Sequence, residues 1–175
     1  KEFKNISVKF VVASQVEVNT PSLRSVCIKY NLPLVSPENL YDYIAKHPQK
    51  ADLVISYLFG KVIRKPLIAL GRNGCVNYHN AILPNYKGLG GYNLAILNEL
   101  DKWGSSVHYI NSEAIDAGPI INVQTFPINP STETAYSLDQ NTQPRMFAQF
   151  KKTILPLIKS RIVKTFPNTG GIYFS

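Results

Sequence analysis

The sequence predicts an α/β fold in which a mostly parallel central sheet is flanked by helices. Short β-branched runs alternate along the chain with helical patterns, which is typical of strands joined by crossover helices. The run at 52–59, DLVISYLF, is almost continuously apolar and indicates a strand buried on both faces. The chain has 175 residues, of which 45% are hydrophobic and 17% are charged. These values favour one globular domain over residues 1–175.

The first half of the chain alternates β-like runs with two helical patterns. Thr20 and Pro21 form an N-cap followed by proline at the first helical position, and Ser36-Pro37 repeats this start. In chain order we expect a strand at 6–12, a helix at 21–30, an extended piece at 34–35, a helix with Leu40 and Ile44 on its apolar side, and the strand at 52–59.

The second half continues the alternation. We expect helices at 66–70, 91–100, 134–139 and 145–164, and strands at 75–79, 106–110 and 120–126. Pro156 lies inside the last helix and should bend it. Ligands of α/β folds bind at the carboxyl ends of the parallel strands. Residues 57–60 and 77–84 fall at such ends, so we expect the site there.

Composition excludes several classes of protein. The net charge of +8 favours anionic partners, but the lysines and arginines are scattered and no zinc or helix-turn-helix pattern occurs. Nucleic acid is therefore not an expected partner. No apolar run reaches the roughly 18 residues that span a bilayer, so a membrane is not expected either. Cys27 and Cys75 lie far apart without a CxxC spacing, which favours core positions and a cytoplasmic location.

Three polar residues follow apolar runs. Asn77 and His79 stand two apart on a predicted strand, so their side chains share one face, and Asp116 comes about forty residues later. Taken singly, each residue has an ordinary structural explanation: a cap, a buried histidine and a turn. Together, an amide, an imidazole and a carboxylate at element ends are the groups needed to move an acyl group onto an amine.

The motifs around these residues resemble the folate-dependent formyltransferase family. Its signature is Asn-x-His-x-Ser-x-Leu-Pro, a following glycine and a distant Asp-x-Gly. This chain reads NYHNAILP at 77–84, then Gly88, then DAG at 116–118, and the run GSSVHYINSEAIDAGPII at 104–121 is also similar. Ala81 stands where the family has serine, and the lost hydroxyl is expected to loosen the loop. The resemblance covers about residues 6–164 and implies a Rossmann-like formyltransferase domain.

The two ends of the chain depart from the family pattern. The family opens with a strand, a glycine-bearing turn and a helix, and this chain begins near the end of that helix. The resemblance thus implies a domain that lacks the first strand and helix, as a fragment or a divergent start. The run at 170–175 ends abruptly in a strand-like pattern, and the second domain of methionyl-tRNA formyltransferase is not expected.

The resemblance also implies roles for individual residues. Asn77 and protonated His79 would donate hydrogen bonds to the tetrahedral oxyanion, while Asp116 would keep His79 charged and relay the proton of the amine; no metal is implied. The implied folate-binding residues are Tyr57, Leu58, Phe59, Gly60, Val62, Ile63, Glu113 and Ile115. The implied substrate-binding residues are Lys87, Gly88, Tyr92 and His108. Structural roles remain alternatives for several of these residues. They are core positions for Leu58, Val62 and Ile63, a solvated Lys87, a Tyr92 packed on its helix and a buried structural His108.

By resemblance, formyltetrahydrofolate donates a formyl group to a small primary amine that carries phosphate. The stretch at 88–93 favours a nucleotide-linked amino sugar as the acceptor. Glycinamide ribonucleotide is the close alternative. A formyltetrahydrofolate hydrolase and a catalytically idle folate-binding module are two further hypotheses, and a homodimer is compatible with all of them.

Overall fold

The structure is a computed structural model that describes residues 5–13, 22–160 and 163–174. The chain divides into two compact units, residues 1–51 and 52–175. The expectation of one domain over 1–175 stays a prediction. The predicted cap at Thr20 and Pro21 lies outside the described residues.

The described residues of the first unit form two short strands and two helices. Strand β1 (Val11–Val12) pairs in parallel with β2 (Leu34–Val35). Helix α1 (Leu23–Lys29) begins after Ser22, whose side chain accepts a hydrogen bond from the Ser25 N–H group. Helix α2 (Leu40–Lys46) buries Leu40 and Ile44, as predicted, but begins after Asn39 instead of Ser36. The strand predicted at 6–12 is reduced to its last two residues.

The second unit is built on a four-stranded sheet with the order β3-β4-β6-β7. Strand β3 (Val54–Tyr57) pairs in parallel with β4 (Cys75–His79). Strands β6 (Lys102–Tyr109) and β7 (Ile120–Pro127) follow in antiparallel pairing. The α/β class is thus confirmed. The antiparallel pairing of β6 with β7 arises because residues 110–119 join them without the helix that a parallel crossover needs.

The outer strand of this sheet is less buried than the sequence indicates. In the sheet of the described residues, β3 lies at the edge. Ser56 is buried, but Ile55 on the opposite face is 41% exposed. The prediction that 52–59 is buried on both faces is therefore wrong. An apolar run does not distinguish an edge strand from a central one, because the neighbours come from elsewhere in the chain.

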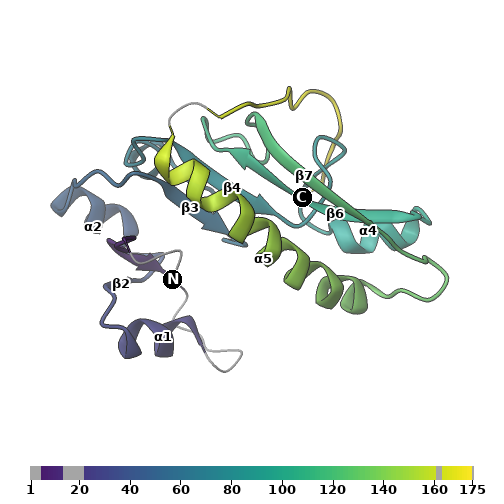
Figure 1. The fold of residues 1–175 in the computed structure, drawn as a ribbon, viewed down its shortest axis with the longest axis horizontal. Coiled ribbons are helices and arrows are strands. Elements are labelled where there is room, and N and C mark those ends of the chain that lie inside the picture. Colours follow the sequence, from purple (N-terminus) through teal and green to yellow (C-terminus); the bar gives the residue numbers. More distant parts are fainter. Residues whose placement is uncertain (1–4, 14–21, 161–162, 175) are drawn as a thin grey trace. The chain divides into compact units, whose positions relative to one another are not determined.

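Three helices accompany this sheet. Helices α3 (Lys65–Ile68) and α4 (Gly91–Leu97) are short. Helix α5 (Ala135–Lys159) is continuous and replaces the two helices predicted at 134–139 and 145–164. It lies across one face of the sheet (Figure 1). Met146 and Leu157 on this helix pack with Val76, Tyr78 and Val107. This burial outweighs the backbone hydrogen bond that Pro144, inside the helix, cannot donate. Among the described residues, no helix has the length and apolarity needed to cross a membrane.

A second, two-stranded sheet lies beside the candidate site. Strand β5 (Tyr86–Gly88) pairs in parallel with β8 (Ile172–Phe174). The sequence predicted only the strand-like character of 170–175 and not β5, which is too short for a pattern of alternation. This pairing brings residues 163–174 next to the loop that follows β4.

Candidate active site

Strands β4 and β6 place three polar side chains side by side. On β4, Val76 and Tyr78 face the core, so Asn77 and His79 face the opposite side. Asn77 is the register partner of His108 on β6. The pairing of β6 with β7 is irregular between Val107 and His108, and such a bulge changes the direction of a side chain. His108 is consequently almost fully buried against Asn77.

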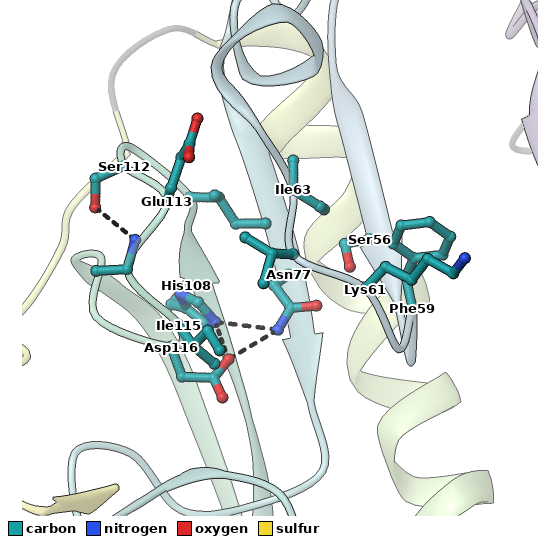
Figure 2. Close-up of a pocket in the computed structure, with 13 residues that line it drawn as sticks. Ser56, Phe59, Lys61, Ile63, Asn77, His108, Ser112, Glu113, Ile115 and Asp116 are labelled. Atoms are coloured by element: carbon teal, nitrogen blue, oxygen red, sulfur yellow. Dashed lines mark hydrogen bonds and ion pairs between the residues drawn. The ribbon is translucent and has the colours of Figure 1, made fainter. Parts of the chain in front are cut away.

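Asp116 completes the group from the loop between β6 and β7. Its backbone has a φ of 48°, in the left-handed region that non-glycine residues rarely adopt. Carboxylate oxygen Oδ1 accepts a hydrogen bond from Asn77 Nδ2 at 3.2 Å and lies 3.2 Å from His108 Nε2. Oxygen Oδ2 accepts from the Gly88 N–H at 2.9 Å and lies 3.5 Å from His79 Nδ1. Figure 2 shows Asn77, His108 and Asp116 converging. The structure thus brings Asn77, His79 and Asp116 together.

His79 is held from both sides of its ring. Nε2 lies 2.9 Å from the Tyr86 carbonyl oxygen, which can only accept, so Nε2 carries a hydrogen. Nδ1 faces Asp116. Burial lowers the pKa of His79, and the Asp116 carboxylate opposes this shift without cancelling it. The expectation of a protonated His79 that donates to the oxyanion stays a prediction. In this structure both of its ring nitrogens face protein groups.

Asp116 itself is ionised. Burial by itself would raise its pKa, but the hydrogen bond from His108, the nearby His79 and the Gly88 N–H group outweigh burial and hold the pKa below its usual range. The carboxylate is 8% exposed, so these contacts act in a poorly solvated environment. The Asp116 carboxylate therefore keeps its negative charge beside the cleft, where it can accept a hydrogen bond from an amine.

A small open cleft lies beside these groups. Its base carries Asn77, His108 and Asp116, and its walls include Ile63 and Ile115 (Figure 2). Val62 also lines the cleft. Glu113 on the rim accepts a hydrogen bond from the Lys65 backbone N–H at 3.1 Å, which connects the 110–119 loop to α3.

Most predicted folate-binding residues line this cleft, and most predicted substrate-binding residues do not. Phe59, Val62, Ile63, Glu113 and Ile115 line it, as does His108 of the substrate set. Tyr57 instead packs on Tyr78 and Phe150 in the core, with ring centroids 5.7 and 6.0 Å away. Leu58 is exposed with a φ of 53°, and neither it nor Gly60 lines the cleft.

The remaining predicted substrate-binding residues lie around the candidate site. Lys87 donates to the carbonyl oxygens of Asn168 and Gly170, at 3.4 and 2.8 Å. Gly88 contributes its N–H group to Asp116. The Tyr92 ring packs on Trp103 of β6, with the ring centroids 6.0 Å apart.

Three contributors to the site were not predicted. The Tyr86 carbonyl holds His79, and a backbone group carries no signal in the sequence. The Ser106 hydroxyl donates to the Ala81 carbonyl and accepts from the Leu83 N–H, so the loop after β4 is held despite the alanine at position 81. Asn168 donates to two carbonyls of the Asp116 loop. Among the described residues, no group of three or more His, Cys, Asp or Glu side chains could hold a metal ion.

Comparisons with known proteins agree with this geometry. The sequence model of the formyl transferase family matches residues 15–153. A methionyl-tRNA formyltransferase of Halalkalibacterium halodurans is 28% identical over 145 residues, which cover 81% of this chain and 45% of that protein. The chain spans about half the length of the curated relatives it matches.

Two solved structures are similar over nearly the whole chain. The sugar 3N-formyl transferase WlaRD, in the presence of dTDP and 5-N-formyl-THF, has a TM-score of 0.77 at 25% identity and covers 94% of this chain and 58% of its own. An N-formyltransferase from Helicobacter canadensis, in complex with folinic acid and dTDP-3-aminofucose, has a TM-score of 0.73 at 25% identity, with 91% and 56% covered. Since the family model matches far more than half of the sequence, this chain belongs to the formyl transferase family.

Proposed function

We propose that this protein transfers a formyl group from formyltetrahydrofolate to a primary amine. The observation that carries the proposal is the meeting of Asn77 and Asp116, with His79 directly behind, at the base of a cleft. The two similar structures described above contain 5-N-formyl-THF or folinic acid. Membership of the formyl transferase family supports the same reaction.

The cleft suits a folate. Val62, Ile63 and Ile115 offer apolar surface for a flat pterin ring, and Asn77 and Asp116 place polar groups beside it. Formyltetrahydrofolate supplies the formyl carbon that the amine attacks. A pterin against this surface directs that carbon toward Asn77 and Asp116, where charge develops during transfer.

Asn77 is the oxyanion donor in this proposal. Its amide nitrogen directs one hydrogen at Asp116. The second Asn77 hydrogen is available to the oxygen of the formyl group when it does not bond to His108 Nε2, which lies 3.2 Å from the amide nitrogen. Removing one such donor typically lowers the rate by about 10²–10³.

Asp116 and His79 receive the proton of the amine. As the nitrogen of the amine bonds to the formyl carbon, it must lose a proton, and the ionised Asp116 carboxylate at the base of the cleft accepts it. His79 Nδ1, 3.5 Å from Asp116 Oδ2, provides the next position for this proton. The carbon–nitrogen bond to folate then breaks, and the folate nitrogen takes up a proton.

The acceptor we favour is a nucleotide-linked amino sugar. The sugar 3N-formyl transferase and the protein bound to dTDP-3-aminofucose support it. The net charge of +8 suits an acceptor that carries phosphate. Methionyl-tRNA is the second candidate, because the curated relatives bear the name methionyl-tRNA formyltransferase.

A coupled assay tests the proposal. Purified protein is mixed with formyltetrahydrofolate and, in turn, with dTDP- and UDP-linked amino sugars, glycinamide ribonucleotide and methionyl-tRNA, while release of tetrahydrofolate is followed. We expect release that depends on one class of amine and falls about 10²–10³-fold in Asn77→Ala. Asn141→Ala, an exposed asparagine on α5, is the matched control and should keep full activity.

The other outcomes distinguish the alternatives. Release without any amine would identify a hydrolase. Binding of folate without release in the presence of any of these amines would contradict the proposed transfer and favour an idle binding module. Release with methionyl-tRNA alone would replace the sugar acceptor by the second candidate.

A further inference from the structure

Residues 163–174 run alongside the loops that form the candidate site. Phe166 exchanges two backbone hydrogen bonds with Ile120, at 2.7 and 3.0 Å. At the other end, Ile172 donates to the Asn85 carbonyl and Leu89 donates to the Phe174 carbonyl. Figure 1 shows this segment in yellow, after the end of α5. It is therefore attached both to the start of β7 and to the strand β5.

Between these attachments, Asn168 is bonded to the loop that carries Asp116. Its Nδ2 atom donates to the carbonyl oxygens of Asp116 and Gly118, each at 2.8 Å. Both hydrogens of one amide are thus used on the backbone on either side of residue 117. The Asp116 backbone has the unfavourable φ of 48°, so this loop needs support from outside to keep its shape.

The backbone of Asn168 connects to the opposite side of the site. Its carbonyl, with that of Gly170, accepts from the Lys87 ammonium. Lys87 lies between Tyr86, whose carbonyl holds His79, and Gly88, whose N–H group holds Asp116. One residue therefore connects the loop that presents the carboxylate with the strand that supplies the partners of that carboxylate and of His79.

We propose that Asn168 is a positioning residue that holds the Asp116 carboxylate in register with His79 and Asn77. Asn168 acts through the loop backbone and touches none of the reacting atoms. The catalytic consequence rests on the proposed function, because only there does Asp116 receive the proton of the amine. The geometric part, the place of the carboxylate beside His79, is independent of any substrate.

The test compares Asn168→Ala and Asn168→Asp with the control Thr169→Ala. The aspartate has the shape of asparagine but directs an oxygen at two carbonyls, so it removes the donor without leaving a cavity. Thr169 is the exposed neighbour in the same segment. The first readout is the protonation of the His79 ring by ¹⁵N NMR as a function of pH, which requires no substrate.

The direction of the expected shift follows from the groups around His79. The ring faces Asp116 from the 110–119 loop, His108 from β6 and the Tyr86 carbonyl from β5. Of these, Asp116 alone is bonded to the Asn168 side chain, and its charge raises the pKa of His79 against the effect of burial. Both Asn168 variants should therefore protonate His79 at lower pH than the wild type and Thr169→Ala.

The second readout is steady-state transfer with the acceptor found in the coupled assay. We expect kcat to fall about 10- to 100-fold in both Asn168 variants, because a displaced catalytic group costs rate even when binding persists. The KM for formyltetrahydrofolate should change little, since Asn168 does not line the cleft.

Each outcome decides one question. Folded Asn168 variants whose His79 titration equals that of the wild type would overturn the proposal. A shifted titration in a protein whose wild type transfers no formyl group would leave the positioning role intact and reject the proposed function. If Asn168→Ala does not fold, Asn168→Asp alone decides. A folded Asn168→Asp with normal kcat contradicts the catalytic role.

Discussion

Asp116 connects more of the site than any other described side chain. Its two carboxylate oxygens face different elements: Oδ1 meets Asn77 on β4 and His108 on β6, and Oδ2 meets Gly88 and His79. A carboxylate can satisfy all of these because each oxygen accepts more than one hydrogen bond. An amide at this position would place donors against the donors that Asn77 and Gly88 already direct there.

Asp116→Asn is therefore expected to abolish most of the activity. The change removes the proton acceptor and turns one donor toward another, so kcat for formyl transfer should fall about 10²–10⁴-fold, the range of general acid–base catalysis. Single-turnover transfer from formyltetrahydrofolate measures it. Asp101→Asn, on an exposed aspartate, is the matched control. Transfer within a few-fold of the wild type would mean that the amine proton leaves by another route.

The residue types of the site could be predicted from the sequence, but their individual roles could not. The motif placed Asn77, His79 and Asp116 together. The role of His79 depended on a carbonyl oxygen and on burial, which the sequence does not display. Tyr57 illustrates the opposite error: it follows an apolar run at a strand end, yet the neighbouring Tyr78 and Phe150 draw it into the core.

At the scale of elements, the sequence predicted the bounds of a strand or helix best where the local pattern alone determines them. Strand β4 has the bounds predicted for it, 75–79, and α4 begins at the predicted Gly91. Failures occurred where distant partners decide. Strand β5 forms because β8 pairs with it from about 86 residues away along the chain, and α5 stays continuous because its apolar side packs on the sheet.

The loop between β6 and β7 depends on the absence of a side chain at Gly118. A Cβ atom there would lie 1.8 Å from the Tyr109 carbonyl oxygen, far inside contact distance, and backbone cannot move aside cheaply. Gly118→Ala should therefore displace the Asp116 loop and its two bonds from Asn168. We expect the free energy of unfolding in urea to fall by about 1–3 kcal/mol.

The control for Gly118→Ala is Gly60→Ala. A Cβ at Gly60 would have no atom within 4 Å, so its free energy of unfolding should stay near that of the wild type. Equal stability of the two variants would show that the 110–119 loop adjusts without strain, and the close approach of Tyr109 would then carry no structural requirement.

At the scale of the whole molecule, the candidate site lies within one compact unit. Asn77, His79, His108, Asp116 and Asn168 all belong to residues 52–175. Two of the site's ionisable groups, His79 and Asp116, are nearly buried and have pKa values shifted downward on folding. The acid stability of this unit is therefore coupled to the chemistry of the site.

The sign of this coupling is the same for both groups. The folded pKa of His79 lies below the unfolded value near 6.5, so the unfolded chain binds a proton first as the pH falls, and stability decreases from about pH 6.5 downward. The folded pKa of Asp116 lies below 3.8, so its contribution is present above that value and is lost as the pH falls through the folded pKa. Acid should thus destabilise the protein in two successive pH ranges, the upper one set by His79 and the lower one by Asp116.

The effect in the upper pH range can be tested with one substitution. His79→Gln removes the titrating ring and keeps a side-chain donor for the Tyr86 carbonyl. The decrease of the free energy of unfolding between pH 6.5 and 5 should therefore become shallower, by up to about 1.4 kcal/mol per pH unit. Urea unfolding followed by fluorescence of Trp103, the single tryptophan and fully buried, measures this within unit 52–175. The exposed His47→Gln is the matched control. An unchanged slope in His79→Gln would show that folding does not lower the pKa of His79, and a slope changed in the opposite direction would show that folding raises it.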